Sequence, residues 1–201
     1  MRAQQLLPAV IAISCLASTP LASQHPQTRA GFWIGAGYGL GNIAWQCNGC
    51  SQQDHGGGSA LVRLGVTASH HVLLGAELNG LGSGVGLFES FGVDSMNEKI
   101  SSSYMAFTVY WYPHAEGGLF LKSGLGASWY DRKQSSSESE SRGAALLVGT
   151  GYDIRIGQMT SITPMLTFWG STKADLKSGF TTLATGLRHT GATFQLSITG
   201  H

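Results

Sequence analysis

Apolar and bare positions alternate with a period of two along residues 31–41, whose sequence is GFWIGAGYGLG. One face carries Phe32, Ile34, Ala36, Tyr38 and Leu40, whereas the other carries Trp33 and glycines. Five glycines in eleven residues exclude a stable helix, because each interior glycine costs a helix about 1 kcal/mol. A soluble strand would show polar side chains on its second face. The pattern therefore favours a strand with one face on lipid and the other toward a crowded barrel interior.

The same alternation recurs along the rest of the chain. It predicts strands over residues 31–41, 59–69, 72–80, 101–112, 119–130, 143–155, 160–169 and 188–199. Pro164 removes one ladder hydrogen bond, which predicts a bulge in the seventh of them. The pattern predicts an all-β fold, an eight-stranded antiparallel up-and-down transmembrane β-barrel whose first strand closes against its last.

The predicted connections alternate between long and short. Long loops cover residues 42–58, 81–99, 131–142 and 170–186, and short turns cover 70–71, 113–118 and 156–159. Outer-membrane barrels have short periplasmic turns and longer extracellular loops. The alternation therefore predicts that both termini are periplasmic. A soluble barrel such as a lipocalin is the alternative, but it has no reason to gather its long loops at one end.

The composition agrees with a membrane location. Charged residues make up 11% of the 201 residues, whereas about a quarter is typical of a soluble domain. A net charge of +1 without a basic cluster argues against nucleic-acid binding. No stretch reaches the roughly 18 apolar residues of a membrane helix. A membrane-embedded chain must then be a closed barrel, which pairs every backbone group.

The first residues have the pattern of a secretory signal. Arg2 provides the positive charge, and an apolar run over 6–17 is followed by small residues up to Ser23. We expect a cleaved signal peptide over 1–23, a short N-terminal lead over 24–30 and a barrel domain over 31–201. A lipoprotein cleavage site at Cys15 is the alternative, with a poorly fitting sequence before it.

Four phrases together resemble the outer-membrane protein A/X-like family of eight-stranded β-barrels. They are GFWIGAGYGLG, HVLLGAELNG, YWYP…GGLFLKSGLG and GYDIRIG…ITPMLTF, and the likeness extends over residues 31–199. The resemblance implies a monomer in the outer membrane of a Gram-negative cell. Its implied partners are outer-membrane lipids and lipopolysaccharide, the barrel assembly machinery and periplasmic chaperones, with no cofactor.

Five polar residues fall in the inward phase of the predicted strands: Arg63, Glu77, Tyr110, Lys122 and Asp153. Arg63 and Glu77 lie on the two arms of one hairpin, so we expect them to be near neighbours. Eight strands enclose an interior that side chains just fill, and a lone buried charge is costly. We interpret the set as paired charges that fill and rigidify the barrel. The alternative is a charged gate in a narrow, low-conductance pore.

The tryptophans fall at or near predicted strand ends. Trp33 and Trp111 lie on the turn side, and Trp45, Trp129 and Trp169 lie on the loop side. Aromatic side chains collect at the two lipid–water interfaces of membrane barrels. We therefore predict that all five are interface aromatics.

Cys47 and Cys50 form a C-x-x-C in a predicted exported loop. Outside the cytoplasm the common outcome is a disulfide, which is our prediction for this pair. Free thiols are one alternative, and a metal site that includes Asp54 and His55 is another.

A catalytic site has weak support in the sequence. Some eight-stranded outer-membrane barrels are lipid A deacylases with a Ser/His pair, but His70, His71 and His114 fall on the short turns, at the wrong end. His189 lies near the outer rim with Ser171 and Asp175, although no recognisable motif joins them. We predict a non-enzymatic protein with no catalytic residue and no metal. It would support envelope integrity and surface contacts through its loops, and a lipid-modifying enzyme is an alternative.

Cations gather near the predicted outer rim. They are Arg132, Lys133, Arg142, Lys173 and Arg188. They could contact lipopolysaccharide phosphates, or they could simply keep the loops solvated.

Overall fold

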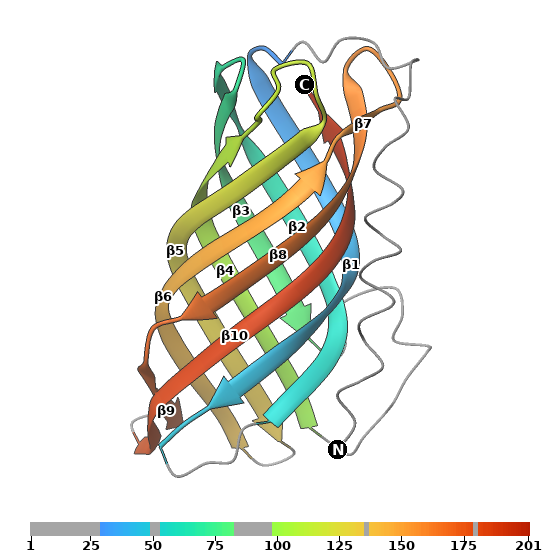
Figure 1. Ribbon diagram of the computed structural model, residues 1–201. Coiled ribbons are helices and arrows are strands. Elements are labelled where there is room, and N and C mark those ends of the chain that lie inside the picture. Colours follow the sequence, from blue (N-terminus) through green and yellow to red (C-terminus); the bar gives the residue numbers. More distant parts are fainter. Residues whose placement is uncertain (1–28, 49–52, 83–97, 135–136, 179–180) are drawn as a thin grey trace, which may run out of the picture.

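A computed structural model describes residues 29–48, 53–82, 98–134, 137–178 and 181–201. Its strands are β1 (Phe32–Gln46), β2 (Gln53–Ser69), β3 (Val72–Gly82), β4 (Glu98–Trp111), β5 (Leu119–Gln134), β6 (Ser137–Tyr152), β7 (Ile154–Arg155), β8 (Thr160–Ser171), β9 (Ala174–Ser178) and β10 (Thr181–Gly200) (Figure 1). The predicted signal peptide, 1–23, lies outside the described residues. Within them, no helix is long and apolar enough to cross a membrane.

The strands form one closed antiparallel barrel. Neighbours pair in the order β1–β2–β3–β4–β5–β6, then β8 and β10, and β10 pairs with β1. The closing ladder runs from Ile34 opposite Gly200 to Gln46 opposite Arg188. The predicted all-β, eight-stranded barrel and its closure between the first and last strands are confirmed. The tilted strands wrap around the axis, and the C-terminus lies at the end with the short turns (Figure 1).

Large apolar side chains cover the outside of the barrel. Each of the eight barrel strands exposes at least one, for example Phe107, Phe194 and Leu125, the last 68% exposed. Soluble monomers rarely expose apolar patches larger than a few hundred Å². This exterior is what a lipid environment requires, and the side chains between these positions point into the barrel.

The strands at the long-loop end extend further than predicted. Residues 131–142 were expected to form a polar loop, but β5 continues to Gln134 and β6 begins at Ser137. Inward Ser139 and Ser141 are buried while Glu140 and Arg142 are exposed, so the alternation continues. Polar residues extend a strand in water because the hairpin ladder pairs their backbone groups whatever their side chains. Likewise, residues 42–58 were expected to form a loop, but β1 continues to Gln46 and β2 begins at Gln53.

The remaining predicted loops differ in outcome. Residues 170–186 contain a short strand, β9, which pairs with an extension of β10 through shifts in register. Most of the predicted loop 81–99 lies outside the described residues. The three short turns lie where they were predicted, at the opposite end of the barrel.

The expected bulge at Pro164 is absent. Gly151 pairs with Met165 and Ile154 pairs with Ile162, so the register between the β6–β7 segment and β8 is unchanged across the gap. Proline has no N–H to donate, and the ladder is interrupted rather than shifted. The interruption separates β6 from β7 at Asp153.

Candidate functional site

A buried carboxylate, Glu77 on β3, is the centre of the barrel interior. Lys122 on β5 donates to its two oxygens at 2.7 and 2.8 Å. On β4, the Tyr104 hydroxyl donates to Oε1 at 2.5 Å and the Tyr110 hydroxyl to Oε2 at 2.8 Å. All four side chains are buried. A charge pair removed from water needs this kind of geometry and additional hydrogen bonds to offset its desolvation.

Arg63 lies opposite Glu77 in the β2–β3 register, as the hairpin predicts. Its guanidinium, however, turns to β10, where it donates to the hydroxyls of Ser197 at 3.1 Å and Thr199 at 2.6 Å. The cation that pairs with Glu77 is Lys122, which no local pattern indicates. Neighbouring backbones therefore do not determine which side chains pair across the lumen.

Asp153 lies at the short-turn end, in a second buried cluster. It accepts hydrogen bonds from Tyr112 at 2.8 Å and from Thr163 at 2.6 Å. Arg29 approaches it at 3.7 Å and stacks over the Tyr112 ring at 3.5 Å from the centroid. Arg29 also donates to the carbonyls of the turn before β5 at 2.9 and 2.6 Å. The five predicted interior residues are thus all buried in the lumen: Glu77, Tyr110 and Lys122 form one cluster, Asp153 belongs to a second, and Arg63 binds β10.

Sequence reasoning missed Arg29. It precedes the first predicted strand and was assigned to the N-terminal lead. The signal that could have found it is the predicted inward carboxylate of Asp153, because a buried charge needs partners that offset its desolvation. Arg29 is buried at the short-turn end of the barrel, where it joins Asp153 to the turn before β5.

Three of the five tryptophans are lumen residues, which corrects the prediction that all five lie at the lipid interfaces. Trp33, Trp45 and Trp169 are buried, Trp33 to 2% exposure. The Trp33 ring lies over Gly65 and Gly75, where added Cβ atoms would come within 2.7 and 2.6 Å of it. A ring fits inside a narrow barrel where the facing positions are glycine. Trp33 in fact shares the inward, glycine-rich phase of its strand, and this signal was available in the sequence.

The other two tryptophans are in the outward phase. Trp111 is 49% exposed and Trp129 is half-buried. For these two residues, a place at the lipid–water interfaces stays a prediction.

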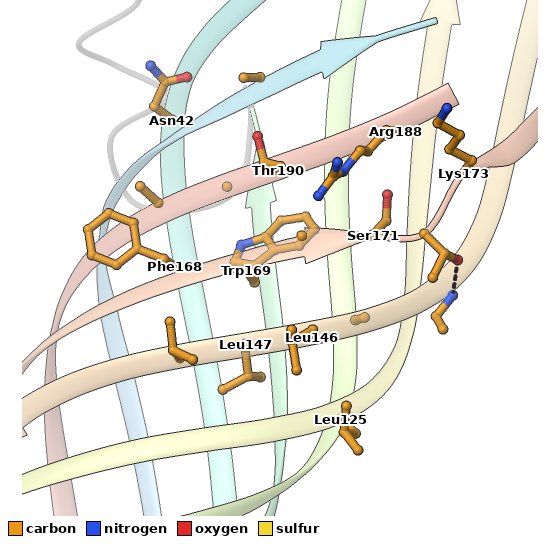
Figure 2. Close-up of a pocket in the computed structure, with 18 residues that line it drawn as sticks. Asn42, Leu125, Leu146, Leu147, Phe168, Trp169, Ser171, Lys173, Arg188 and Thr190 are labelled. Atoms are coloured by element: carbon orange, nitrogen blue, oxygen red, sulfur yellow. Dashed lines mark hydrogen bonds between the residues drawn. The ribbon is translucent and has the colours of Figure 1, made fainter. Parts of the chain in front are cut away.

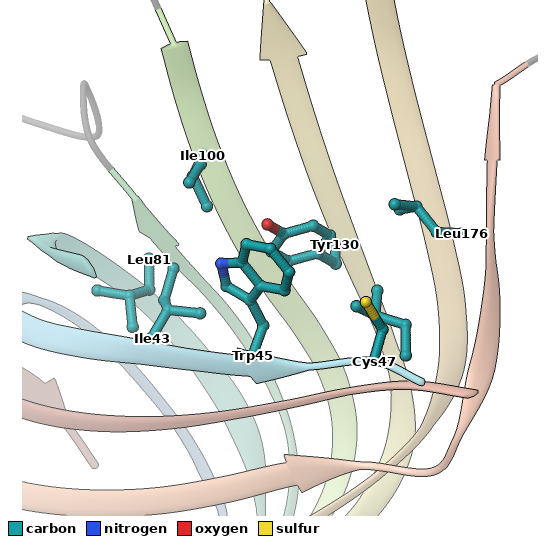
Figure 3. Packing of buried hydrophobic residues seen from close by; sticks show 8 residues of the cluster. Ile43, Trp45, Cys47, Leu81, Ile100, Tyr130 and Leu176 are labelled. Atoms are coloured by element: carbon teal, nitrogen blue, oxygen red, sulfur yellow. The ribbon is translucent and has the colours of Figure 1, made fainter. Parts of the chain in front are cut away.

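Apolar clusters fill the lumen on both sides of the polar centre. Toward the short turns, Trp33 packs with Phe120 and Met165 among others. At the long-loop end the buried cluster is Ile43, Trp45, Cys47, Leu81, Ile100, Tyr130, Leu176 and Leu187 (Figure 3). The interior is therefore a packed core, as expected of eight strands.

Cys47 is disulfide-bonded. Its predicted partner, Cys50, lies outside the described residues. Asp54 is exposed and His55 half-buried. Across the described part of the chain, no group of three or more His, Cys, Asp or Glu side chains is arranged to hold a metal ion.

The structure brings Ser171 and His189 together. The Ser171 hydroxyl lies 2.9 Å from Nδ1 of His189 and also accepts the backbone N–H of His189 at 2.9 Å. Both residues are buried, and the His189 ring packs between Trp169 and Tyr130. Asp175 is exposed. This geometry holds the end of the β8–β10 ladder, where regular pairing stops at Gly170 and Thr190.

Comparisons with known proteins identify the fold but not a closer relative. No protein-family model matches the chain, and no curated protein matches its sequence. Among solved structures, Neisserial surface protein A superposes with a TM-score of 0.58 at 10% identity, over 87% of this chain and 99% of that one. Ail, the attachment invasion locus protein of Yersinia pestis, gives 0.54 at 8% identity, over 86% and 99%. The fold is that of the eight-stranded outer-membrane β-barrels. The resemblance drawn from the sequence is confirmed at the level of fold.

Proposed function

We propose that the chain is an integral outer-membrane protein of a Gram-negative cell with a non-enzymatic, structural and surface-contact role. The observation that carries this proposal is a closed barrel that is apolar outside and filled inside by a buried Glu77–Lys122 pair and aromatic rings. A filled interior supports a rigid scaffold rather than the alternative of a narrow pore.

The proposal includes an orientation. The short turns and both barrel termini face the periplasm, and the extended hairpins face outward, as in outer-membrane barrels generally. The signal peptide, the periplasmic chaperones and the barrel assembly machinery belong to this route. The folded protein is a monomer embedded in outer-membrane lipid and lipopolysaccharide.

The surface role falls to the outward hairpins. The β5–β6 hairpin carries the exposed side chains of Glu140 and Arg142, so it offers polar and charged contacts beyond the apolar belt. Ail is named for attachment and invasion, and one of its structures is a complex with the heparin analogue sucrose octasulfate. A barrel of this fold that presents polar hairpins is consistent with contact to other surfaces.

Two measurements test the membrane barrel and its filled lumen. Unboiled protein in detergent should migrate differently on a gel from boiled protein, because a closed barrel resists unfolding. The purified barrel in planar bilayers should give no steady single-channel conductance. A soluble, lipid-free monomer after signal cleavage contradicts the membrane location, and a reproducible conductance contradicts the structural role in favour of a pore.

For the proposed absence of catalysis, Ser171 is the decisive residue. We interpret its bond to His189 as structural, because the hydroxyl also accepts a backbone N–H and both side chains are buried. Lipid A mass spectra of cells that overexpress the protein should match those of control cells and of cells expressing Ser171→Ala. Loss of an acyl chain with the wild type but not with Ser171→Ala would establish a deacylase instead.

A further inference from the structure

A groove crosses the outer wall of the barrel near the long-loop end. It has a volume of about 910 Å³ and runs over β1, β10, β8 and β6 (Figure 2). Ligand sites commonly have about 300–1,000 Å³. Most of its lining residues are in the outward, lipid-facing phase of these strands, and Leu147, Trp169 and Ser171 of the inward phase also line it.

Three small outward residues, Ala44, Gly170 and Thr190, are among those that line this groove. Cross-strand pairing lines up Ala44 with Thr190, Thr190 with Gly170, and Gly170 with Leu146. A Cβ atom added at Gly170 would meet only Thr190 Cγ2, at 3.4 Å. The position is open rather than closely packed, in contrast to the flanking Phe168 and Leu125, which project from the wall. The floor forms a trough into which a hydrocarbon chain can settle.

Two cations stand at the loop-side end of the trough, Arg188 and Lys173 (Figure 2). Both are exposed, and among the residues that the structure describes neither has an ion-pair partner. Two hydrogen bonds hold the segment before Lys173 on the barrel wall: the Thr172 N–H donates to the Ala144 carbonyl at 2.8 Å, and the Ala144 N–H donates to the Thr172 hydroxyl at 3.0 Å.

Other charged residues at this end of the barrel are Asp175 and the paired residues Arg142 and Glu140. Exposed Asp175 follows Lys173 by two positions and is the acid closest to it along the chain. Arg142, a third exposed cation at this end, pairs with Glu140 at 3.1 Å. The groove thus ends at two cations whose charge is available for an anion.

We propose that this groove binds the lipid A part of lipopolysaccharide. One acyl chain lies in the trough, and a phosphate lies between Arg188 and Lys173. A phosphomonoester carries about −1.5 to −2 charges at neutral pH, which suits two cations better than the single charge of a phosphodiester lipid. The assignment rests on the proposed outer-membrane orientation, which puts this end of the barrel in the outer leaflet.

The test measures lipid A binding to the folded protein in detergent micelles by native mass spectrometry. Arg188→Gln/Lys173→Gln should weaken binding about tenfold or more, because it removes two charge-assisted contacts. Gly170→Leu should also weaken it by filling the trough. Arg142→Gln, which lies outside the groove, should bind like the wild type. Heat-dependent gel mobility checks that each variant is folded.

Three results overturn the proposal. They are unchanged affinity of the Arg188→Gln/Lys173→Gln variant, an equal loss in Arg142→Gln, and equally tight binding of phosphatidylglycerol by the wild type. Failure of the wild type to insert into lipid vesicles is a separate result. It contradicts the proposed membrane location itself. If the wild type inserts but its lipid A binding does not depend on Arg188 and Lys173, only the lipid site is contradicted.

Discussion

Glu77 illustrates how single residues control this barrel. Its carboxylate is buried, and it accepts hydrogen bonds from Lys122, Tyr104 and Tyr110. Removing one partner leaves a buried charge that nothing else compensates, whereas removing both charges together avoids that penalty. The interior thus depends on matched pairs of residues more than on any residue alone.

Lys122→Met should lower the free energy of unfolding by about 3–5 kcal/mol, because Glu77 then remains as an uncompensated buried charge. Urea titration of the barrel in lipid vesicles, followed by gel mobility, measures the loss. Glu77→Gln/Lys122→Met should recover a large part of it. Equal stability of Lys122→Met and the wild type would show that the pair contributes nothing.

Gly75→Val should destabilise the barrel by about 1–3 kcal/mol, as overpacking does in well-packed cores. A Cβ atom there would come within 2.6 Å of both the Trp33 ring and the Leu64 carbonyl oxygen. Gly80→Val is the matched control on the same strand, because no atom lies within 4 Å of its added Cβ. The same urea titration compares them, and similar losses in both would contradict a specific role for the Trp33 contact.

At the scale of elements, the strands have two different parts. In the apolar part of each strand, successive side chains point alternately to lipid and to the lumen. In the polar part, backbone pairing continues toward the long-loop end. On β5 and β6 the pairing continues without a shift from Leu119 opposite Tyr152 to Gln134 opposite Ser137. Because backbone pairing supports these polar hairpin ends, we expect that the barrel can form without them.

Replacing residues 132–139 by Asn-Gly joins Asp131 to Glu140, which already lie opposite each other, through a two-residue turn that suits a hairpin. The shortened barrel should fold with the heat-dependent mobility of the wild type and change its unfolding midpoint little. Loss of the folded band would show that the hairpin tip takes part in folding.

At the scale of the whole molecule, the usual distribution of a globular protein is reversed. Large apolar side chains are exposed around the wall, and the charges Arg29, Arg63, Glu77, Lys122 and Asp153 are buried inside. This arrangement is stable only where the medium around the barrel is apolar.

Leu125→Arg places a charge on the exposed middle of β5 and should destabilise the barrel in a bilayer by about 2–4 kcal/mol. Arg142→Leu, on the polar hairpin beyond the apolar belt, should change stability little, because an exposed ion pair contributes about 0–1 kcal/mol. Urea titration in vesicles compares the two variants. Equal tolerance of both would contradict the assignment of the apolar exterior to lipid.

The sequence by itself determined the eight strands, their inward and outward faces, and the closure of residues 31–41 against the last strand. The strands and their faces follow from a period of two, which is a local property of the backbone. The closure follows because a barrel in a membrane leaves no strand edge unpaired. It also determined that the inside would be crowded, because glycines alternate with apolar residues over 31–41.

Only the tertiary structure decided the rest. It showed that Lys122, not Arg63, pairs with Glu77, that Arg29 lies beside Asp153, that β1 continues far enough to bury Trp45 in the lumen, and that Ser171 bonds His189. Strand tilt and stagger determine which side chains meet across a barrel, and the alternation of residues along one strand predicts neither of them. The groove beside Arg188 has the same origin, because small residues far apart in the chain become its floor only when β1, β6, β8 and β10 lie side by side.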